Sequence, residues 1–281
     1  DHGKLGHGDT QMHRLVPTVI ETLQEIPITK VVSMSTCVIA IDHRGDTYVW
    51  GTGGSTNSLT FVRSEIRPLR LEALPVKQPV KDFSCGLGHA LFLLASGAVY
   101  SWGNGGNGRL GLGDLQDRAQ ATLVTVLPGD EKVVAVQCGA SHSMVLMVSG
   151  DVYSWGKNTQ GQCGGDHTEE NVLWPSQVKN LGTSDDRHIS LAGRASRHRV
   201  VKIAAGWEHS AALTEEGRVF MWGCGYKDSR RGVIPPVLGL GHNECRAAPQ
   251  LITSLEDVVI RDITCGWDHC LALDAAGKLL S

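Results

Sequence analysis

Four histidines stand at equivalent points along the chain, and histidine is the side chain that most readily binds metals or transfers protons near neutral pH. A metal site needs several ligands within about 2.0–2.3 Å of one point, whereas residues that recur at an interval are spread around a repeating structure. We therefore expect these histidines to be buried structural residues that hydrogen-bond neighbouring backbone, and we expect no metal. Each ends a Cys/Ala-Gly-x-x-His element, and the four elements are Cys85–His89, Cys138–His142, Ala205–His209 and Cys265–His269.

No other motif is arranged for catalysis. Gly103–Gly108 matches the dinucleotide-binding pattern Gly-x-Gly-x-x-Gly, but another glycine turn, Arg109–Gly113, replaces the helix that should follow and bind pyrophosphate. The chain has no Gly-x-Ser-x-Gly motif and no phosphate-binding Gly-Lys-Ser/Thr loop, and carboxylates such as Asp114 stand in predicted loops. We therefore expect no enzyme chemistry, no cofactor and no small-molecule substrate.

The histidine elements belong to a longer repeat. An aromatic-x-Trp-Gly motif occurs four times, a turn glycine precedes each copy and recurs near the end of the chain, and a glycine-rich element follows the tryptophan. Periods of about 40–50 residues built from strands and glycine turns are typical of propellers and solenoids. The tryptophans are Trp50, Trp102, Trp155 and Trp222, the turn glycines are Gly45, Gly97, Gly150, Gly217 and Gly277, and the glycine-rich elements are 3–8, 108–113, 161–164 and 238–241.

Each repeat contains four predicted strands. In the third repeat, β-rich apolar segments cover 133–138, 143–148, 152–155 and 173–178. Ser149–Asp151 has the composition of a hairpin turn, because glycine adopts a positive φ readily. Four short antiparallel strands joined by glycine corners make a propeller blade. The sequence therefore predicts an all-β propeller of four-stranded antiparallel blades.

The segment Tyr100–Asp114, which follows a Cys-Gly-x-x-His element, resembles the repeat of the regulator-of-chromosome-condensation family. The resemblance covers nearly the whole chain and implies one propeller over residues 1–281. Members of that family usually have seven blades, so the roughly five repeats present would be part of a seven-bladed ring. A complete five-bladed ring is the alternative. The repeat is interrupted in the same loop region at both ends, so we expect a fragment of a longer protein.

Composition limits the kind of partner. The formal net charge of −3 does not favour a surface dominated by nucleic-acid phosphates, so a nucleic-acid partner is not expected. Apolar residues make up 41% of the 281-residue chain, which is enough for a core. No apolar run is long enough to span a bilayer, so we expect no membrane insertion.

Cysteine placement favours a reducing compartment. Cys85, Cys138 and Cys265 fall at equivalent positions of successive repeats, which lie too far apart for a disulfide. Cys265, His269 and Cys270 lack the Cys-x-x-Cys spacing of common zinc sites. We therefore expect reduced, buried cysteines in a cytoplasmic or nuclear protein.

Two repeats place a tryptophan between the glycine and the histidine, at Trp207 and Trp267. Members of the family that sense ultraviolet light in plants carry repeated Gly-Trp-Arg-His-Thr elements, in which tryptophans absorb and arginines hold a dimer together. Here Glu208 and Asp268 replace those arginines, which argues against photoreception. Tryptophan is enriched at binding hot spots, so Trp207 and Trp267 are candidate partner-binding residues. Packing between blades is the structural alternative.

A first insertion interrupts the period at about 181–200. It is polar and rich in arginine, and it could be a phosphorylation site or a surface for an acidic partner; a solvated loop is the simpler interpretation. The candidate regulatory residues are Arg194, Ser196, Arg197 and Arg199.

A second insertion, at about 224–236, follows Trp222. In the founding member of the family, the exchange factor for the GTPase Ran, one blade carries a wedge at the corresponding place. Asp228–Ile234 is similar to part of that wedge, whereas Pro235 and Pro236 depart from it. The resemblance implies Asp228, Arg230 and Arg231 as the residues that would act on a GTPase, and they join the candidate partner surface.

These observations favour a protein–protein interaction module without chemistry of its own, within a larger regulatory protein such as a ubiquitin ligase or a trafficking factor. Its partners would be proteins, a small GTPase among the candidates. The alternative is a guanine-nucleotide exchange factor for a Ran-like GTPase. The third hypothesis is a tryptophan-based ultraviolet photoreceptor.

Overall fold

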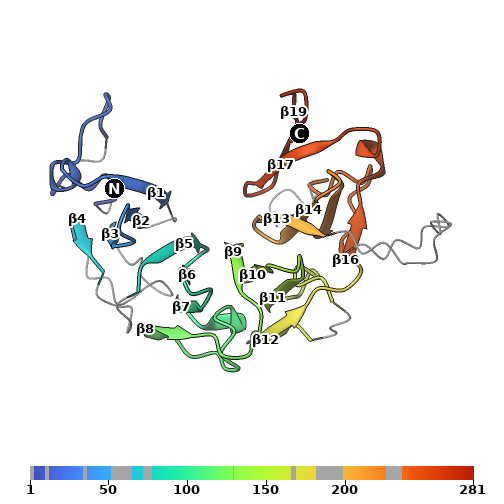
Figure 1. Cartoon of the computed structure of the whole chain (residues 1–281), viewed down its shortest axis with the longest axis horizontal. Helices are drawn as coiled ribbons and strands as arrows, with labels where there is room; N and C mark the ends of the chain where they lie inside the picture. The colour runs from blue at the N-terminus through green and yellow to red at the C-terminus, as the bar shows by residue number, and fades with distance from the viewer. Residues whose placement is uncertain are drawn as a thin grey trace, which may run out of the picture.

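The strand-rich repeats fold into five antiparallel sheets that follow one another around an arc (Figure 1). The structure is a computed structural model, and it describes residues 3–9, 13–33, 37–51, 65–71, 78–128, 130–165, 169–181, 199–225 and 236–281. Four sheets have four strands and the fifth has three, all paired in sequence order. The predicted propeller of antiparallel blades is confirmed.

The first three blades are complete four-stranded sheets. They comprise β1 (Ile28–Ser33), β2 (Cys37–Asp42), β3 (Thr47–Gly51) and β4 (Glu65–Arg70); β5 (Val80–Cys85), β6 (His89–Leu94), β7 (Val99–Gly103) and β8 (Arg118–Leu123); and β9 (Val133–Cys138), β10 (His142–Met147), β11 (Val152–Lys157) and β12 (Asn171–Gln177).

The last two blades follow the same order. They comprise β13 (Val200–Ala205), β14 (His209–Thr214), β15 (Val219–Gly223) and β16 (Arg246–Leu251), and then β17 (Ile260–Cys265), β18 (Cys270–Asp274) and β19 (Leu279–Leu280). In the part of the chain that the structure describes, three short 3-10 turns accompany the strands, at Glu21–Leu23, Gly106–Gly108 and Thr253–Leu255.

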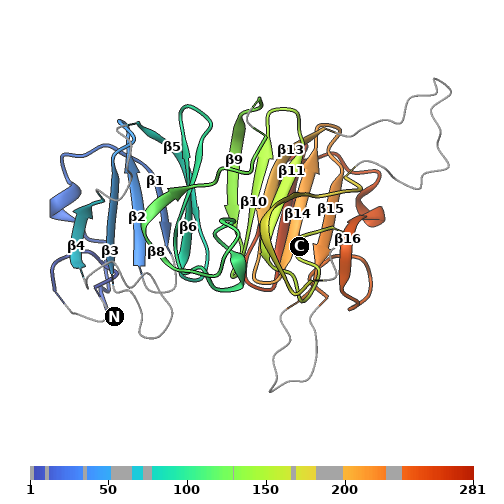
Figure 2. The ribbon, with the colours of Figure 1, turned by 90° about the horizontal axis from the view of Figure 1, so that it is seen from below.

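In the four-stranded blades, the first strand lies nearest the middle of the arc, as Figure 1 shows for β5, β9 and β13. The fourth strand lies at the outer edge, as it shows for β8, β12 and β16. The strands run along the axis of the arc (Figure 2). The arc is open between the first and the fifth blades (Figure 1), and so the closed five-bladed ring is not seen. Seven blades remain a prediction.

The hydrophobic core lies between blades. The second strands β6, β10 and β14 are buried along their whole length, because a neighbouring blade covers each face of their sheet. One core cluster joins Ile39 and Val49 of the first blade to Phe92 and Trp102 of the second. Such two-sided burial explains why these strands have no polar alternation.

The hairpin glycines behave as their sequence context predicts. Gly45, Gly97, Gly150, Gly217 and Gly277 all have φ between +81° and +93°, in the region that only glycine adopts freely.

The cysteine prediction is confirmed in part. Cys85, Cys138 and Cys265 form no disulfide, but only Cys138 is buried; Cys85 and Cys265 are half-buried, because they border a cavity on the inner side of the arc. Cys224 and Cys245 do form one, which the sequence did not indicate, and it joins the start of the second insertion to the residue before β16. Within the described residues, no helix has the length and apolar character needed to cross a bilayer.

Candidate functional site

The repeated histidines link neighbouring blades. His89 begins β6 and its Nε2 lies 3.0 Å from the Ser143 hydroxyl of the next blade. His142 begins β10 and is 2.9 Å from the Ser210 hydroxyl in the same way. Both histidines are fully buried, as predicted. The Nε2 atom of each ring bonds a side-chain hydroxyl across the seam between two blades, a partner that the sequence did not predict and that only the packing of blades could decide.

The hydroxyl at each seam fixes the histidine tautomer. Ser143 donates its hydroxyl hydrogen to the carbonyl of Arg109 at 2.8 Å, so its oxygen accepts a hydrogen bond from Nε2–H of His89. Burial lowers the pKa of His142 to about 3, and it lowers the pKa of His89 well below its ordinary value. These imidazoles are therefore neutral and inaccessible, which suits a structural role and not acid–base catalysis.

The two remaining histidines differ from this pattern. His209 is buried, but the atom opposite its Nε2 is the sulfur of Cys270, at 3.1 Å. His269 is exposed, contrary to the prediction of burial, because no described segment packs over its ring.

The repeated tryptophans serve a second interblade contact. The indole N–H groups of Trp155 and Trp222 donate to the carbonyls of Arg109 and Gln162, at 2.9 and 3.0 Å. These carbonyls belong to the glycine-rich elements that join the third and fourth strands of the preceding blade. Trp50 donates in the same way to Lys4, at 2.8 Å. Trp102 differs and donates within its own blade, to Ala119 at 3.0 Å.

The loops that join the first and second strands of the blades meet around the arc's inner side. Backbone hydrogen bonds tie them in series, from Leu87 to Ala140 at 2.9 Å, from Ala140 to Gly206 at 3.3 Å and from Trp207 to Trp267 at 3.1 Å. Together with Ser33 of the first blade, these loops line a cavity of about 350 Å³. We take this central cavity as the candidate functional site.

The two predicted partner-binding tryptophans come together at this cavity. The rings of Trp207 and Trp267 are stacked with centroids 3.7 Å apart and an interplanar angle of 3°. The stack joins the fourth and fifth blades, so the interblade packing considered from the sequence is present. Trp267 nevertheless keeps 55% of its surface exposed. The Trp267 ring is thus held in place by the parallel Trp207 ring and is still accessible.

Glu208, the acidic residue next to Trp207, lies between two blades. It is 7% exposed and forms an ion pair with Lys157 of the preceding blade. Its carboxylate is therefore engaged inside the seam between blades instead of facing a partner.

The chain's relatives agree with this architecture. The match to the family described as RCC1-like domain covers residues 1–281. The chain belongs to that family. The sequence resemblance drawn from Tyr100–Asp114 is therefore confirmed.

This RCC1-like domain is 28% identical over 274 residues to the Ultraviolet-B receptor UVR8 of Arabidopsis thaliana, a match that covers 97% of this chain and 56% of UVR8. It is 32% identical over 268 residues to the E3 ubiquitin-protein ligase HERC2 of Homo sapiens, covering 92% of this chain and 5% of HERC2. Yeast RCC1 (Prp20), solved bound to Kap60, has a TM-score of 0.68 at 21% identity, covering 92% of this chain and 55% of Prp20.

The RCC1-like domain thus spans about half of UVR8 and Prp20 and a small part of HERC2. At 21% identity, the likeness to Prp20 shows the fold alone. The activities and partners of these larger proteins do not transfer by similarity.

Several predicted residues lie outside the described part of the chain. These are the wedge candidates Asp228, Arg230 and Arg231 and the loop residues Arg194, Ser196 and Arg197. Arg199 is described; it is exposed, donates to the Val148 carbonyl at 3.0 Å and lies 3.8 Å from Glu215.

The sequence reasoning missed two residues of the central cavity, Leu87 and Ala140. A signal for them was available. Like Trp207 and Trp267, each is the first variable residue of a Gly-x-x-His element. Equivalent positions of a repeat face the same way, so this position lines the cavity in blade after blade.

Proposed function

We propose that this RCC1-like domain is a protein-interaction module whose docking site is the central cavity with the Trp207–Trp267 stack. The observation that carries the proposal is the parallel stack of the two rings, in which Trp267 remains 55% exposed. A large aromatic surface held rigid before binding loses little conformational entropy when a partner arrives. Tryptophan is also among the residues most enriched at binding hot spots.

The lining of the cavity defines the partner chemistry. Leu87 and Ala140 are apolar, and the other contributions come largely from glycine and cysteine. The one carboxylate next to the stack on the fourth blade, that of Glu208, is engaged with Lys157. The site therefore suits a protein segment that inserts an apolar or aromatic side chain against Trp267.

The named relatives support an interaction role without fixing the partner. Prp20 is bound to Kap60 in its structure, and HERC2 is an E3 ubiquitin-protein ligase. A propeller that recruits protein partners to a larger regulatory protein in the cytoplasm or nucleus is consistent with both.

The other two hypotheses stay predictions. Exchange activity toward a Ran-like GTPase depends on Asp228, Arg230 and Arg231, which the structure does not describe. Ultraviolet reception gains a stacked tryptophan pair and a relative, UVR8, that is an Ultraviolet-B receptor. The chain lacks the arginines beside the stack that the family resemblance associates with a light-sensitive dimer.

Affinity capture with the intact protein tests the proposed function. Partners recovered by the wild type are compared by quantitative mass spectrometry with those recovered by Trp267→Ala, and the dissociation constant of each differing partner is then measured. Loss of a hot-spot tryptophan should weaken the binding of a true partner at least about tenfold, or about 1.4 kcal/mol.

The matched control is Trp174→Ala, because Trp174 is 47% exposed on β12, away from the central cavity. Its partner set should equal that of the wild type. Equal dissociation constants for wild type and Trp267→Ala, with every captured partner, would exclude the stack as the docking site. Accelerated nucleotide release from a GTPase that survives Trp267→Ala would instead favour the exchange-factor hypothesis.

A further inference from the structure

We propose that His209, Cys265 and Cys270 form a binding site for a thiophilic divalent cation, Zn²⁺, in the seam between the fourth and fifth blades. One nitrogen and two sulfur ligand atoms of these side chains lie within 4.8 Å of one another. One imidazole and two thiolates form a ligand set that zinc prefers, and three protein ligands leave a fourth position open.

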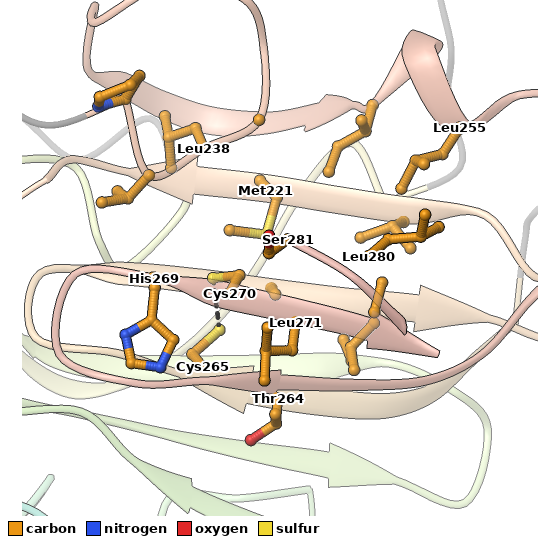
Figure 3. A pocket seen from close by; sticks show the side chains of 18 of the residues that line it. Met221, Leu238, Leu255, Thr264, Cys265, His269, Cys270, Leu271, Leu280 and Ser281 are labelled. Atoms are coloured by element: carbon orange, nitrogen blue, oxygen red, sulfur yellow. Dashed lines mark hydrogen bonds between the residues drawn. The ribbon is translucent and has the colours of Figure 1, made fainter. Parts of the chain in front are cut away.

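Strand pairing creates the two-sulfur half of the site. Cys265 ends β17 and Cys270 begins β18, and the two residues are direct partners across the antiparallel ladder. Their sulfur atoms are 3.1 Å apart (Figure 3). In a tetrahedral site with Zn–S distances of about 2.3 Å, the sulfurs would lie somewhat farther apart. A small rotation of the two side chains is enough to admit the ion.

The repeat supplies the nitrogen. His209 is the seam histidine of the fourth blade, and its Nε2 points at the Cys270 sulfur from 3.1 Å. The sequence hypothesis considers His269 with these cysteines, but the structure brings His209, 61 residues from Cys270, into the cluster instead.

The other seams show why this one differs. The seam of His89 has Cys138 opposite Ser143, so it offers a single sulfur, and the seam of His142 has Ala205 opposite Ser210, so it offers none. In both, the serine is already committed to a backbone carbonyl. Three seams of the same construction thus carry zero, one and two sulfurs, and the last has a complete zinc-type ligand set.

An adjacent cavity gives access to the fourth position. Cys265, His269 and Cys270 line a cavity of about 440 Å³, which Met221 and Leu238 border on the apolar side (Figure 3). A water molecule in this cavity can complete the coordination. The ion would then tie β14 to β17 and β18 across the seam.

Cobalt titration of the intact protein tests the site. The protein is purified with reductant, stripped of metal by a chelator and titrated with Co²⁺, with Zn²⁺ used for displacement and for stoichiometry. We expect thiolate-to-cobalt absorption and tetrahedral d–d bands that Zn²⁺ abolishes. Cys270→Ser and Cys265→Ala should each lose one equivalent of bound metal and this absorption.

The chain itself provides fold-compatible variants and a control. Serine and alanine occupy the corresponding positions in other blades, at Ser210 and Ala205, so both variants should fold. Cys138→Ala removes a cysteine at the position equivalent to Cys265 and should bind metal as the wild type does.

Two outcomes would overturn the proposal. One is equal metal stoichiometry and equal cobalt spectra for wild type and Cys270→Ser. The other is recovery of Cys265 and Cys270 as a disulfide that, once reduced, still binds no cobalt; the pair would then be a redox-active dithiol.

Discussion

At the scale of single residues, buried histidines connect neighbouring blades through one side-chain hydrogen bond each. His142 contributes a single Nε2–H donor to Ser210, and burial keeps its ring neutral. Protonation would place a charge inside the seam, where desolvation makes charge costly. His142, and His89 in the same way, therefore link the stability of the fold to pH.

Acid should destabilise the protein through these residues. Because the folded pKa of His142 is about 3 and its ordinary value is 6.5, its stabilising contribution is complete above pH 6.5 and is lost as the pH falls toward 3. Urea unfolding of the intact protein across this range should show His142→Gln less stable than wild type near neutrality, with the difference narrowing in acid. His43→Gln, at an exposed position, is the control. A difference that does not change with pH would contradict this linkage.

At the scale of elements, the glycine-rich connections between the third and fourth strands of a blade pack against the tryptophan of the next blade. Gly164 has a φ of +65°, and a Cβ there would lie 2.6 Å from the indole nitrogen of Trp222. Gly241, at the corresponding element of the next blade, has a φ of +77°, but no described atom beyond its chain neighbours lies within 4 Å of the position that a Cβ would take. Both glycines have a positive φ, but only Gly164 also lies against a tryptophan. Comparing substitutions at the two positions therefore distinguishes the cost of the backbone conformation from the cost of the steric contact.

Alanine substitution should rank the two positions. Gly241→Ala should cost about 1–2 kcal/mol of unfolding free energy, the cost of the left-handed conformation. Gly164→Ala should cost about 1–3 kcal/mol more, because its methyl group also displaces the Trp222 ring. Denaturant unfolding of the intact protein measures both values. Equal losses would show that the tryptophan contact adds nothing to the glycine requirement.

At the scale of the whole molecule, ion pairs between neighbouring blades contribute to the stability of the arc. Lys157 and Glu208 join the third and fourth blades, and the Glu208 side chain is only 9% exposed. Lys202 and Asp262 join the fourth and fifth blades, and the Asp262 side chain is 51% exposed. Solvent screens the second pair more than the first, so their contributions should differ.

Neutralising the two carboxylates tests this difference. Glu208→Gln leaves Lys157 partly buried without its counter-charge and should lower the unfolding free energy by about 1–3 kcal/mol. Asp262→Asn should change it by less than about 1 kcal/mol, as is usual for exposed pairs. Denaturant midpoints of the intact proteins give the comparison. A larger loss for Asp262→Asn would show that burial does not govern these seams.

The fold was accessible from the sequence because it depends on local patterns that recur. The alternation of apolar strands with glycine turns predicted β9 to β12 within one or two residues, and the positive φ of Gly150 and its equivalents follows from the same pattern. Family membership followed from the same repeated residues.

The contacts between repeats were decided by the tertiary structure alone. No local pattern states that His89 bonds Ser143, that Trp207 stacks on Trp267, or that the disulfide partner of Cys224 is Cys245. The first two pairs lie in different blades, so the rotation from one blade to the next sets their distances, and the two cysteines are 21 residues apart within the fourth blade. The sequence by itself therefore determined the blade, and the packing of blades determined the central cavity and the seam where His209 meets Cys265 and Cys270.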